Sequence, residues 1–231
     1  MTLNQWDKYH CYGLVSLSFV YSLTQSFLPI VGFSILSFTA LWISHWKEIK
    51  NLRPPGGLAN RVTLIRLAGL TTLMLLAFRI SNQVLSLLLF VLVLMDGLDG
   101  YLARKKDQRT TFGANFDMET DALFVCLVSV LLISKGLSAK WILIPAWIKY
   151  YYTVFIDLAG LNTVPEKRTL FGATAAFIMF LALVLAFVLP EKTRLILTIS
   201  ATILLTISFA SSLVKAVVLK NRPRGDVKET K

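Results

Sequence analysis

The chain has 231 residues, of which 55% are hydrophobic and only 16% are charged. This composition, with a mean hydropathy of +0.65, is unusual for a soluble domain and favours a protein that has the lipid bilayer as its solvent. The formal net charge of +11 is compatible with nucleic-acid binding, but the Lys and Arg residues lie in short clusters between apolar runs. Because that distribution is typical of membrane topology, we expect no nucleic-acid partner.

The first apolar stretch, from Tyr12 to Trp46, is longer than the roughly 20 residues that cross a bilayer once. It is interrupted by the polar residues Thr24 to Ser26 and by Pro29. Proline suits the first turn of a helix better than its middle, so we predict two helices, with one kinked and tilted helix as the alternative. A Pro-Pro-Gly-Gly sequence within residues 51–60 then predicts a linker. Residues 1–58 are therefore assigned to N-terminal membrane helices and their linker.

Six more apolar segments lie within residues 59–219, and their short connections predict antiparallel neighbours. The predicted segments are Val62–Ile80, Gln83–Ala103, Phe116–Ile133, Trp141–Leu158, Leu170–Leu189 and Leu195–Leu219. The predicted fold class is thus all-α, a polytopic membrane bundle with a six-helix core. Residues 220–231 are charged and lack apolar periodicity, so we expect a basic, solvated tail.

Positive charge differs strongly between alternate loops of this core. The linker, the tail and the loops on the same side hold sixteen Lys and Arg residues, whereas the loops on the opposite side hold five. Positive residues are retained on the cytoplasmic side of a membrane. We therefore expect a multi-pass integral membrane protein with the positive side in the cytoplasm.

Four aspartates lie at the cytoplasmic ends of the second and third core segments: Asp96, Asp99, Asp117 and Asp121. Charged residues at such positions are costly and indicate function. At 100° per residue, Gly113, Asp117 and Asp121 fall within an arc of about 80°. Two antiparallel helices would therefore bring the two carboxylate pairs face to face.

Carboxylates that lie so close together repel one another unless cations neutralise them. Ligands that are all oxygen suit Mg²⁺ or Mn²⁺, so we expect the four aspartates to bind divalent metal. Gly100 and Gly113 would let a donor approach the backbone, and Arg104 could contact phosphate oxygens. The alternative to a metal site is a solvated loop in which the charges merely lie at two helix ends. Charges in such a loop need not fall on one helical face in both segments, as these aspartates do.

This stretch resembles the signature of the CDP-alcohol phosphatidyltransferase family without a departure. The matching residues are Asp96, Asp99, Gly100, Ala103, Arg104, Gly113, Asp117 and Asp121. A weaker resemblance covers Asn60, Thr63 and Arg66, which are similar to the family's Asn, Thr and Arg at the start of its first core helix. These three could also cap a helix and pair with headgroups.

The resemblance implies that a hydroxyl group attacks a phosphorus of a CDP-linked donor, usually CDP-diacylglycerol, and that CMP leaves. It implies two Mg²⁺ or Mn²⁺ ions on the four aspartates, with Asp121 also taking the proton of the acceptor. The residues expected at the donor are Asn60, Thr63, Arg66, Gly100, Ala103, Arg104 and Gly113. It further implies an enzyme of phospholipid synthesis that forms a homodimer among membrane lipids.

Two departures bear on the acceptor. Met118 follows Asp117, where family members that make phosphatidylglycerophosphate often have proline, which disfavours glycerol 3-phosphate. Arg66 stands where serine-transferring members tend to have Asn, which disfavours serine. A phosphorylated acceptor needs further cations, for which the candidates are Arg109, Lys149, Lys167 and Arg168.

These cations also have structural explanations. Lys149 could pair with Glu119 instead, and Lys167 and Arg168 could serve only to set the membrane topology.

Other functions of the chain also stay open. The enzyme could move a small phosphoalcohol from its CDP ester onto a lipid hydroxyl, or the chain could be an inactive scaffold or a cation-coupled transporter. A transporter would favour internal repeats and a site near the bilayer midplane.

Overall fold

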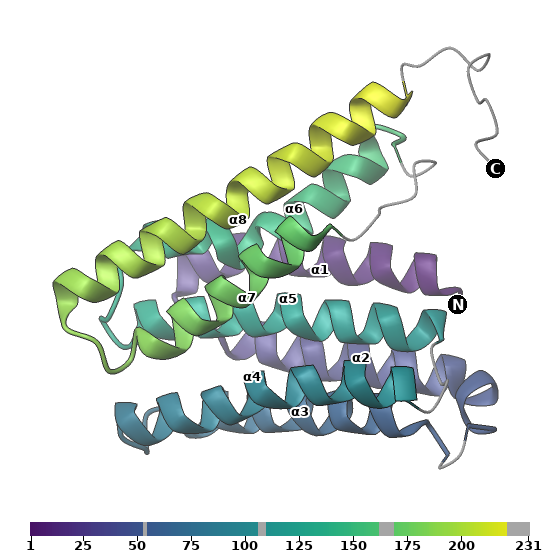
Figure 1. Cartoon of the computed structure of the whole chain (residues 1–231), viewed down its shortest axis with the longest axis horizontal. Helices are drawn as coiled ribbons and strands as arrows, with labels where there is room; N and C mark the ends of the chain where they lie inside the picture. The colour runs from purple at the N-terminus through teal and green to yellow at the C-terminus, as the bar shows by residue number, and fades with distance from the viewer. Residues whose placement is uncertain (53–54, 106–109, 162–168, 221–231) are drawn as a thin grey trace.

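The computed structural model describes residues 1–52, 55–105, 110–161 and 169–220, although the side chains of residues 98–105 and 219–220 lie outside this description. The described residues form α-helices, one short 3₁₀ turn at Lys140–Ile142, and no strand (Figure 1). The helices are α1 (Leu3–Thr24), α2 (Leu28–Ile49), α3 (Leu58–Leu76), α4 (Asn82–Lys105), α5 (Thr111–Ser134), α6 (Leu143–Leu158), α7 (Leu170–Leu185) and α8 (Glu191–Lys220). The prediction of an all-α bundle is confirmed.

The N-terminal stretch forms two helices, so the alternative of one kinked helix is wrong. α1 ends at Thr24, and Gln25 then adopts the left-handed conformation with φ 54°. The backbone N–H of Gln25 donates to the carbonyl of Tyr21 at 2.8 Å and closes the last turn. α2 begins at Leu28 with Pro29 in its first turn, where proline costs no helical hydrogen bond.

The six core helices lie near their predicted ranges, with differences at the ends. α3 and α7 each stop four residues before the predicted ends at Ile80 and Leu189, because turns follow them. α5 and α7 begin where threonine caps the first turn. The hydroxyl of Thr110 accepts a hydrogen bond from the backbone N–H of Gly113 at 2.9 Å. The hydroxyl of Thr169 accepts one from the backbone N–H of Gly172 at 3.1 Å.

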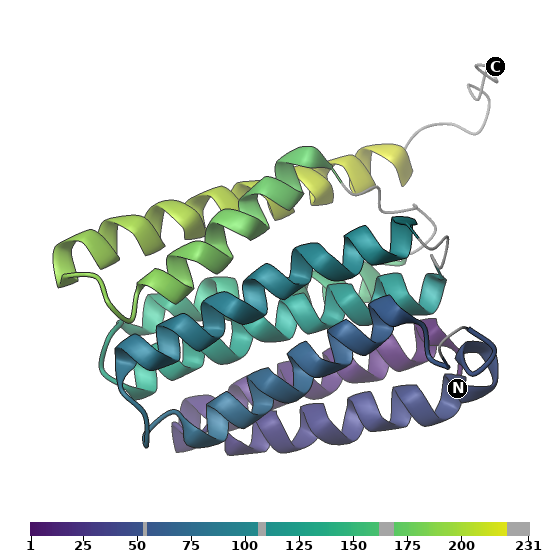
Figure 2. The same cartoon turned by 60° about the horizontal axis from the view of Figure 1, so that its bottom comes forward.

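α5 lies at the centre of the bundle, in contact with α2, α3, α6 and α7 (Figures 1 and 2). Every residue from 123 to 132 on this helix is buried. At its far end, the ammonium of Lys135 donates to Asn82 of α4 at 3.0 Å. The central position of α5 lets side chains from several helices converge on it.

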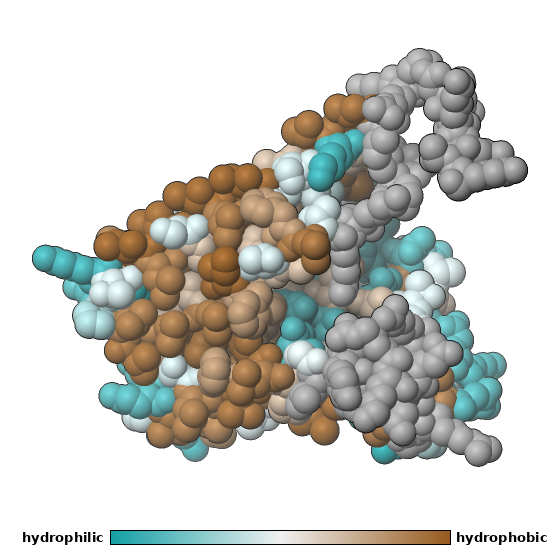
Figure 3. Space-filling view, viewed as in Figure 1, coloured by the Kyte–Doolittle hydropathy of each residue, from teal (hydrophilic) through white to brown (hydrophobic). Residues whose placement is uncertain are grey.

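Much of the outer surface is apolar. Three of the described helices, α2, α3 and Glu191–Val218 of α8, are long and apolar enough to cross a membrane. Figure 3 shows hydrophobic side chains over most of the visible face, with hydrophilic residues gathered near the ends of the helices. An apolar surface of this extent suits contact with lipid better than contact with water.

Candidate functional site

Three of the four predicted aspartates lie close together in the structure. Asp96 comes from the second half of α4, and Asp117 and Asp121 come from the first half of α5. One carboxylate oxygen from each lies within 4.8 Å of the others. The sequence predicted that carboxylates of these two helices meet, and this is confirmed for Asp96, Asp117 and Asp121.

Arg66 of α3 lies among these three carboxylates. Its Nη1 is 2.7 Å from Oδ1 of Asp96 and 3.1 Å from Oδ1 of Asp117. Its Nη2 is 2.7 Å from Oδ1 of Asp121. Only 4% of the arginine side chain is exposed, compared with 24–28% of the three carboxylates. Charge-assisted hydrogen bonds of this kind are among the strong ones, so Arg66 partly neutralises the cluster.

Gly113 marks a close approach between α3 and α5. A Cβ atom added to Gly113 would lie 2.6 Å from Oδ1 of Asn60 and 3.1 Å from Oγ1 of Thr110. Asn60 and Thr63 are both buried, one turn apart on α3. The sequence predicted that Gly113 leaves room for a donor, and the structure adds that it leaves room for the side chain of Asn60.

Several predicted site residues lie outside the part of the chain that the structure describes. These are Gly100 and the side chains of Asp99, Ala103 and Arg104, although the backbone of all four continues α4 beyond Asp96. The acceptor candidates Arg109, Lys167 and Arg168 also lie outside the described residues. Their roles stay predictions.

Lys149 of α6 pairs with Glu119, one of the two alternatives that its position in the sequence left open. Its ammonium also lies 3.5 Å from Oδ1 of Asp7 and 3.5 Å from Sγ of Cys11, both on α1. Sequence reasoning did not single out these two residues. Their spacing of four residues put them on one helical face, but no pattern in the sequence indicated that this face meets α6.

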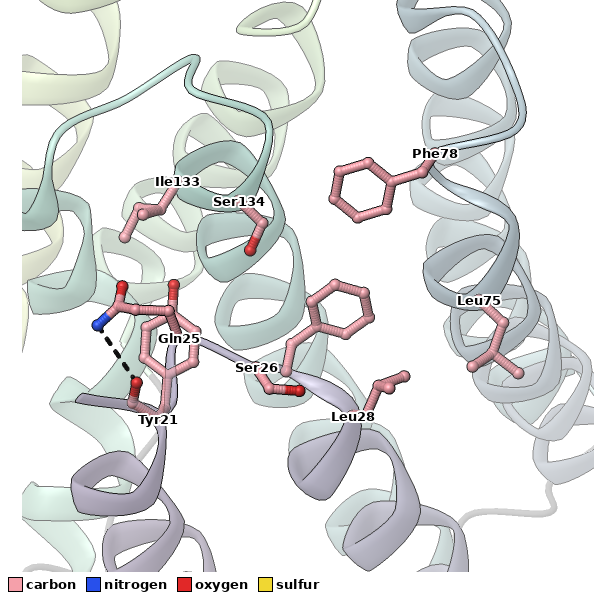
Figure 4. Close-up of a pocket in the computed structure, with 9 residues that line it drawn as sticks. Tyr21, Gln25, Ser26, Leu28, Leu75, Phe78, Ile133 and Ser134 are labelled. Atoms are coloured by element: carbon pink, nitrogen blue, oxygen red, sulfur yellow. Dashed lines mark hydrogen bonds between the residues drawn. The ribbon is translucent and has the colours of Figure 1, made fainter. Parts of the chain in front are cut away.

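A cavity of about 650 Å³ lies at the opposite end of the bundle from the aspartates. It is lined by the end of α1, the turn into α2, the end of α3 with the turn after it, and the last residues of α5 (Figure 4). The lining residues are Tyr21, Gln25, Ser26, Phe27, Leu28, Leu75, Phe78, Ile133 and Ser134. Ser134 is thirteen residues beyond Asp121 on the same helix, which corresponds to about 20 Å along the axis. The cavity is therefore separate from the carboxylate cluster.

The chemistry of the cluster fits a divalent cation. Its described ligand atoms are all carboxylate oxygens, the type that Mg²⁺ and Mn²⁺ prefer. Arg66 supplies one positive charge against three carboxylates, so the cluster keeps negative charge that a divalent cation can neutralise. Asp96, Asp117 and Asp121 could therefore hold such an ion.

A family match agrees with this geometry. Residues 57–217, which include α3 to α7 and nearly all of α8, match the CDP-alcohol phosphatidyltransferase family, and the chain belongs to it. The match begins just before α3 and leaves α1 and α2 outside.

The chain is also similar to curated proteins named CDP-diacylglycerol–glycerol-3-phosphate 3-phosphatidyltransferase. It is 39% identical to the one from Rickettsia prowazekii over 88 residues, or 36% of this chain and 48% of the relative. It is 42% identical to the one from Haemophilus influenzae over 77 residues, or 33% of this chain and 41% of the relative. The chain thus spans less than half the length of these relatives.

Proposed function

We propose that this protein is a metal-dependent membrane phosphotransferase of phospholipid synthesis. It transfers a phosphatidyl group from CDP-diacylglycerol to a hydroxyl acceptor and releases CMP. The observation that carries the proposal is the convergence of Asp96, Asp117 and Asp121 within 4.8 Å of one another in a chain of this family.

The metal would be Mg²⁺ or Mn²⁺, as two ions held by Asp96, Asp99, Asp117 and Asp121. When bound, such ions withdraw charge from the donor's diphosphate and stabilise the attacking and leaving oxygens. The buried guanidinium of Arg66, beside the same carboxylates, would add positive charge next to that diphosphate. The other donor-binding residues in this proposal are Asn60, Thr63, Gly100, Ala103, Arg104 and Gly113.

Asp121 acts as the base in this reaction. Its carboxylate takes the proton of the acceptor hydroxyl while the hydroxyl oxygen forms a bond to the phosphorus of the phosphatidyl group. The bond between that phosphorus and the CMP oxygen breaks, and CMP leaves with the bonding electron pair. The new ester and CMP are the two products.

Glycerol 3-phosphate is the first acceptor to test, because the relatives from Rickettsia prowazekii and Haemophilus influenzae carry it in their names. This support outweighs the departure at Met118, which is a single position. Arg109, Lys167 and Arg168 are the cations proposed for the acceptor's phosphate. Lys149 is a weaker candidate because Glu119 and Asp7 already compete for its ammonium.

The protein is proposed to be a multi-pass homodimer with its site at the cytoplasmic face. The unequal distribution of Lys and Arg between alternate loops supports this orientation. The three helices that are long and apolar enough to cross a membrane support insertion.

The decisive experiment measures CMP release by the purified protein with CDP-diacylglycerol, Mg²⁺ or Mn²⁺, and a panel of hydroxyl acceptors. Asp121→Asn should lower the rate by about 100-fold or more, the usual contribution of a general base, while donor binding largely survives. Glu191→Gln, which changes an exposed carboxylate at the opposite end of the bundle, should behave as the wild type.

Retained activity in Asp121→Asn would refute the assignment of the base. If no acceptor gives metal-dependent CMP, the proposal fails for this donor. CDP-linked small alcohols with a lipid hydroxyl acceptor then become the next test, because the same site could run the alternative transfer.

A further inference from the structure

Glu119 is a buried carboxylate that the proposed reaction does not use. It lies between Asp117 and Asp121 in the sequence, and at 100° per residue it points about 160° away from both. Its side chain is 0% exposed, and it pairs with the ammonium of Lys149 from α6. Its second oxygen, Oε2, has no hydrogen-bond partner among the described residues. Lys149 is therefore the partner that compensates its charge.

The charges around Glu119 favour an ion pair over a second metal site. Ligand atoms of Asp7, Cys11 and Glu119 lie within 4.8 Å of one another, as those of a metal site would. The ammonium of Lys149 faces all three of them, paired with Glu119 and 3.5 Å from Asp7 and Cys11. Lys149 leaves the charge of one carboxylate uncompensated here, whereas Arg66 leaves two in the cluster of Asp96, Asp117 and Asp121. A divalent ion is therefore less favoured at Glu119.

Two cations from different helices therefore hold α5 from opposite sides. Arg66 of α3 pairs with Asp117 and Asp121 on one face, and Lys149 of α6 pairs with Glu119 on the other. A buried ion pair is a poor source of stability, because apolar residues of similar volume often do as well. Its better documented use is to specify one arrangement among several.

We infer that the Lys149–Glu119 pair, completed by Asp7 of α1, is a positioning device that fixes the rotation of α5 and so the direction of Asp117 and Asp121. The inference rests on the proposed function for its consequence, since rotation of α5 matters because those two aspartates hold metal. In this inference Glu119 and Lys149 are positioning residues, because they act on the site through the orientation of α5. The inference also gives α1, which lies outside the family match, a part in the site.

The packing of the N-terminal helices supports this role. Phe38 of α2 packs against Phe116 of α5 with ring centroids 5.7 Å apart. Trp42 of α2 contacts Phe112 and Phe116 of α5, each at 5.8 Å. Apolar contacts thus hold the N-terminal pair against the half of α5 that carries the aspartates, and Asp7 adds the charged contact.

The test uses the full chain with the double substitution Glu119→Gln and Lys149→Met. This change removes both charges of the Lys149–Glu119 pair together and keeps the net charge constant. Asp7 loses its contact with Lys149, but its side chain is 28% exposed and can be solvated. Binding of Mn²⁺ is measured by electron paramagnetic resonance without substrates. Hydrogen–deuterium exchange follows the backbone of residues 113–124. We expect Mn²⁺ affinity to fall by about tenfold, the loss typical of residues that orient metal ligands, and exchange in α5 to become faster, with little change in the melting temperature.

Lys8→Met is the matched control. It removes the bridge from Lys8 to Asp157, 2.8 Å long, which also joins α1 to α6 but does not touch α5. It should alter neither Mn²⁺ affinity nor exchange in residues 113–124. Unchanged affinity and exchange in a folded double variant would overturn the inference.

Two further arms keep the test decisive. If the double variant does not fold, Asp7→Asn is used, because it leaves the Lys149–Glu119 pair intact. Faster exchange in α5 then supports the inference, and unchanged exchange contradicts it. If the wild-type protein binds no Mn²⁺, the proposed function fails on its metal, and exchange in α5 still decides the inference.

Discussion

Arg66 is the residue on which the charge balance of the carboxylate cluster depends. Its guanidinium reaches one oxygen from each of Asp96, Asp117 and Asp121. A divalent ion bound by these carboxylates would meet the same positive group. Arg66 and the metal therefore share one set of ligands, and any change at Arg66 should alter how strongly the protein depends on metal.

Arg66→Gln should lower the stability of the metal-free protein. Removing one partner of a buried ion pair costs about 3–5 kcal/mol, and the partial exposure of the carboxylates favours the lower end. Mn²⁺ should restore most of the loss by supplying positive charge. The measurement is thermal unfolding in detergent with and without Mn²⁺, with Arg79→Gln at an exposed position as the control. Equal destabilisation with and without Mn²⁺ would count against this account.

At the scale of the helix, α5 depends on close approach to α3 at Gly113. The position needs glycine for its lack of a side chain and not for its backbone, because it is helical and a Cβ would meet Asn60. The same contact places the start of α5 beside the buried residues Asn60 and Thr63.

Gly113→Ala should destabilise the protein by about 1–3 kcal/mol, the usual cost of overpacking, and should reduce CMP release. Adding Asn60→Ala should recover part of the stability by making room, although it should not recover activity if Asn60 contacts the donor. Gly32→Ala on α2 is the matched control, since its Cβ would meet nothing within 4 Å. The three variants are compared by thermal unfolding. A general effect of losing glycine would also appear in Gly32→Ala, whereas steric overlap with Asn60 would appear only in Gly113→Ala.

At the scale of the whole molecule, the number of described helices and the unequal loop charge predict a definite topology. The end of α8 and the start of α1 should both lie on the cytoplasmic side, together with the aspartates. A reporter active only in the cytoplasm, fused after residue 220, should be active, and the same reporter fused after residue 138 should not. Activity at residue 138 alone would reverse the orientation.

Local periodicity explains why much of this architecture could be predicted. The separation of α1 from α2, the six core helices and the meeting of Asp96 with Asp117 and Asp121 all follow from apolar runs, turn residues and helical phase. Helix ends were less certain, since α3 and α7 stop early at turns that apolar composition does not reveal.

The face of α5 that carries Glu119 shows which contacts could not be predicted from the sequence. The pairing of Glu119 with Lys149 joins helices α5 and α6, neighbours in the chain, and could be considered in advance. Asp7 and Cys11 lie more than a hundred residues away from both. Their contact depends on which side of the core the N-terminal helices pack against, and no periodicity within one helix contains that information.

The burial of α5 also has a consequence for how the protein is made. This helix carries Asp117, Glu119 and Asp121 near its start, and it is not among the three helices apolar enough to cross a membrane by themselves. Carboxylates in a segment leaving the translocation machinery would disfavour its release into lipid. We therefore expect α5 to stay in contact with that machinery until its carboxylates are paired. Their partners are Arg66, which is synthesised earlier, and Lys149, which is synthesised later. α5 would then be among the last helices to reach its final position, although it is central in the chain and in the fold.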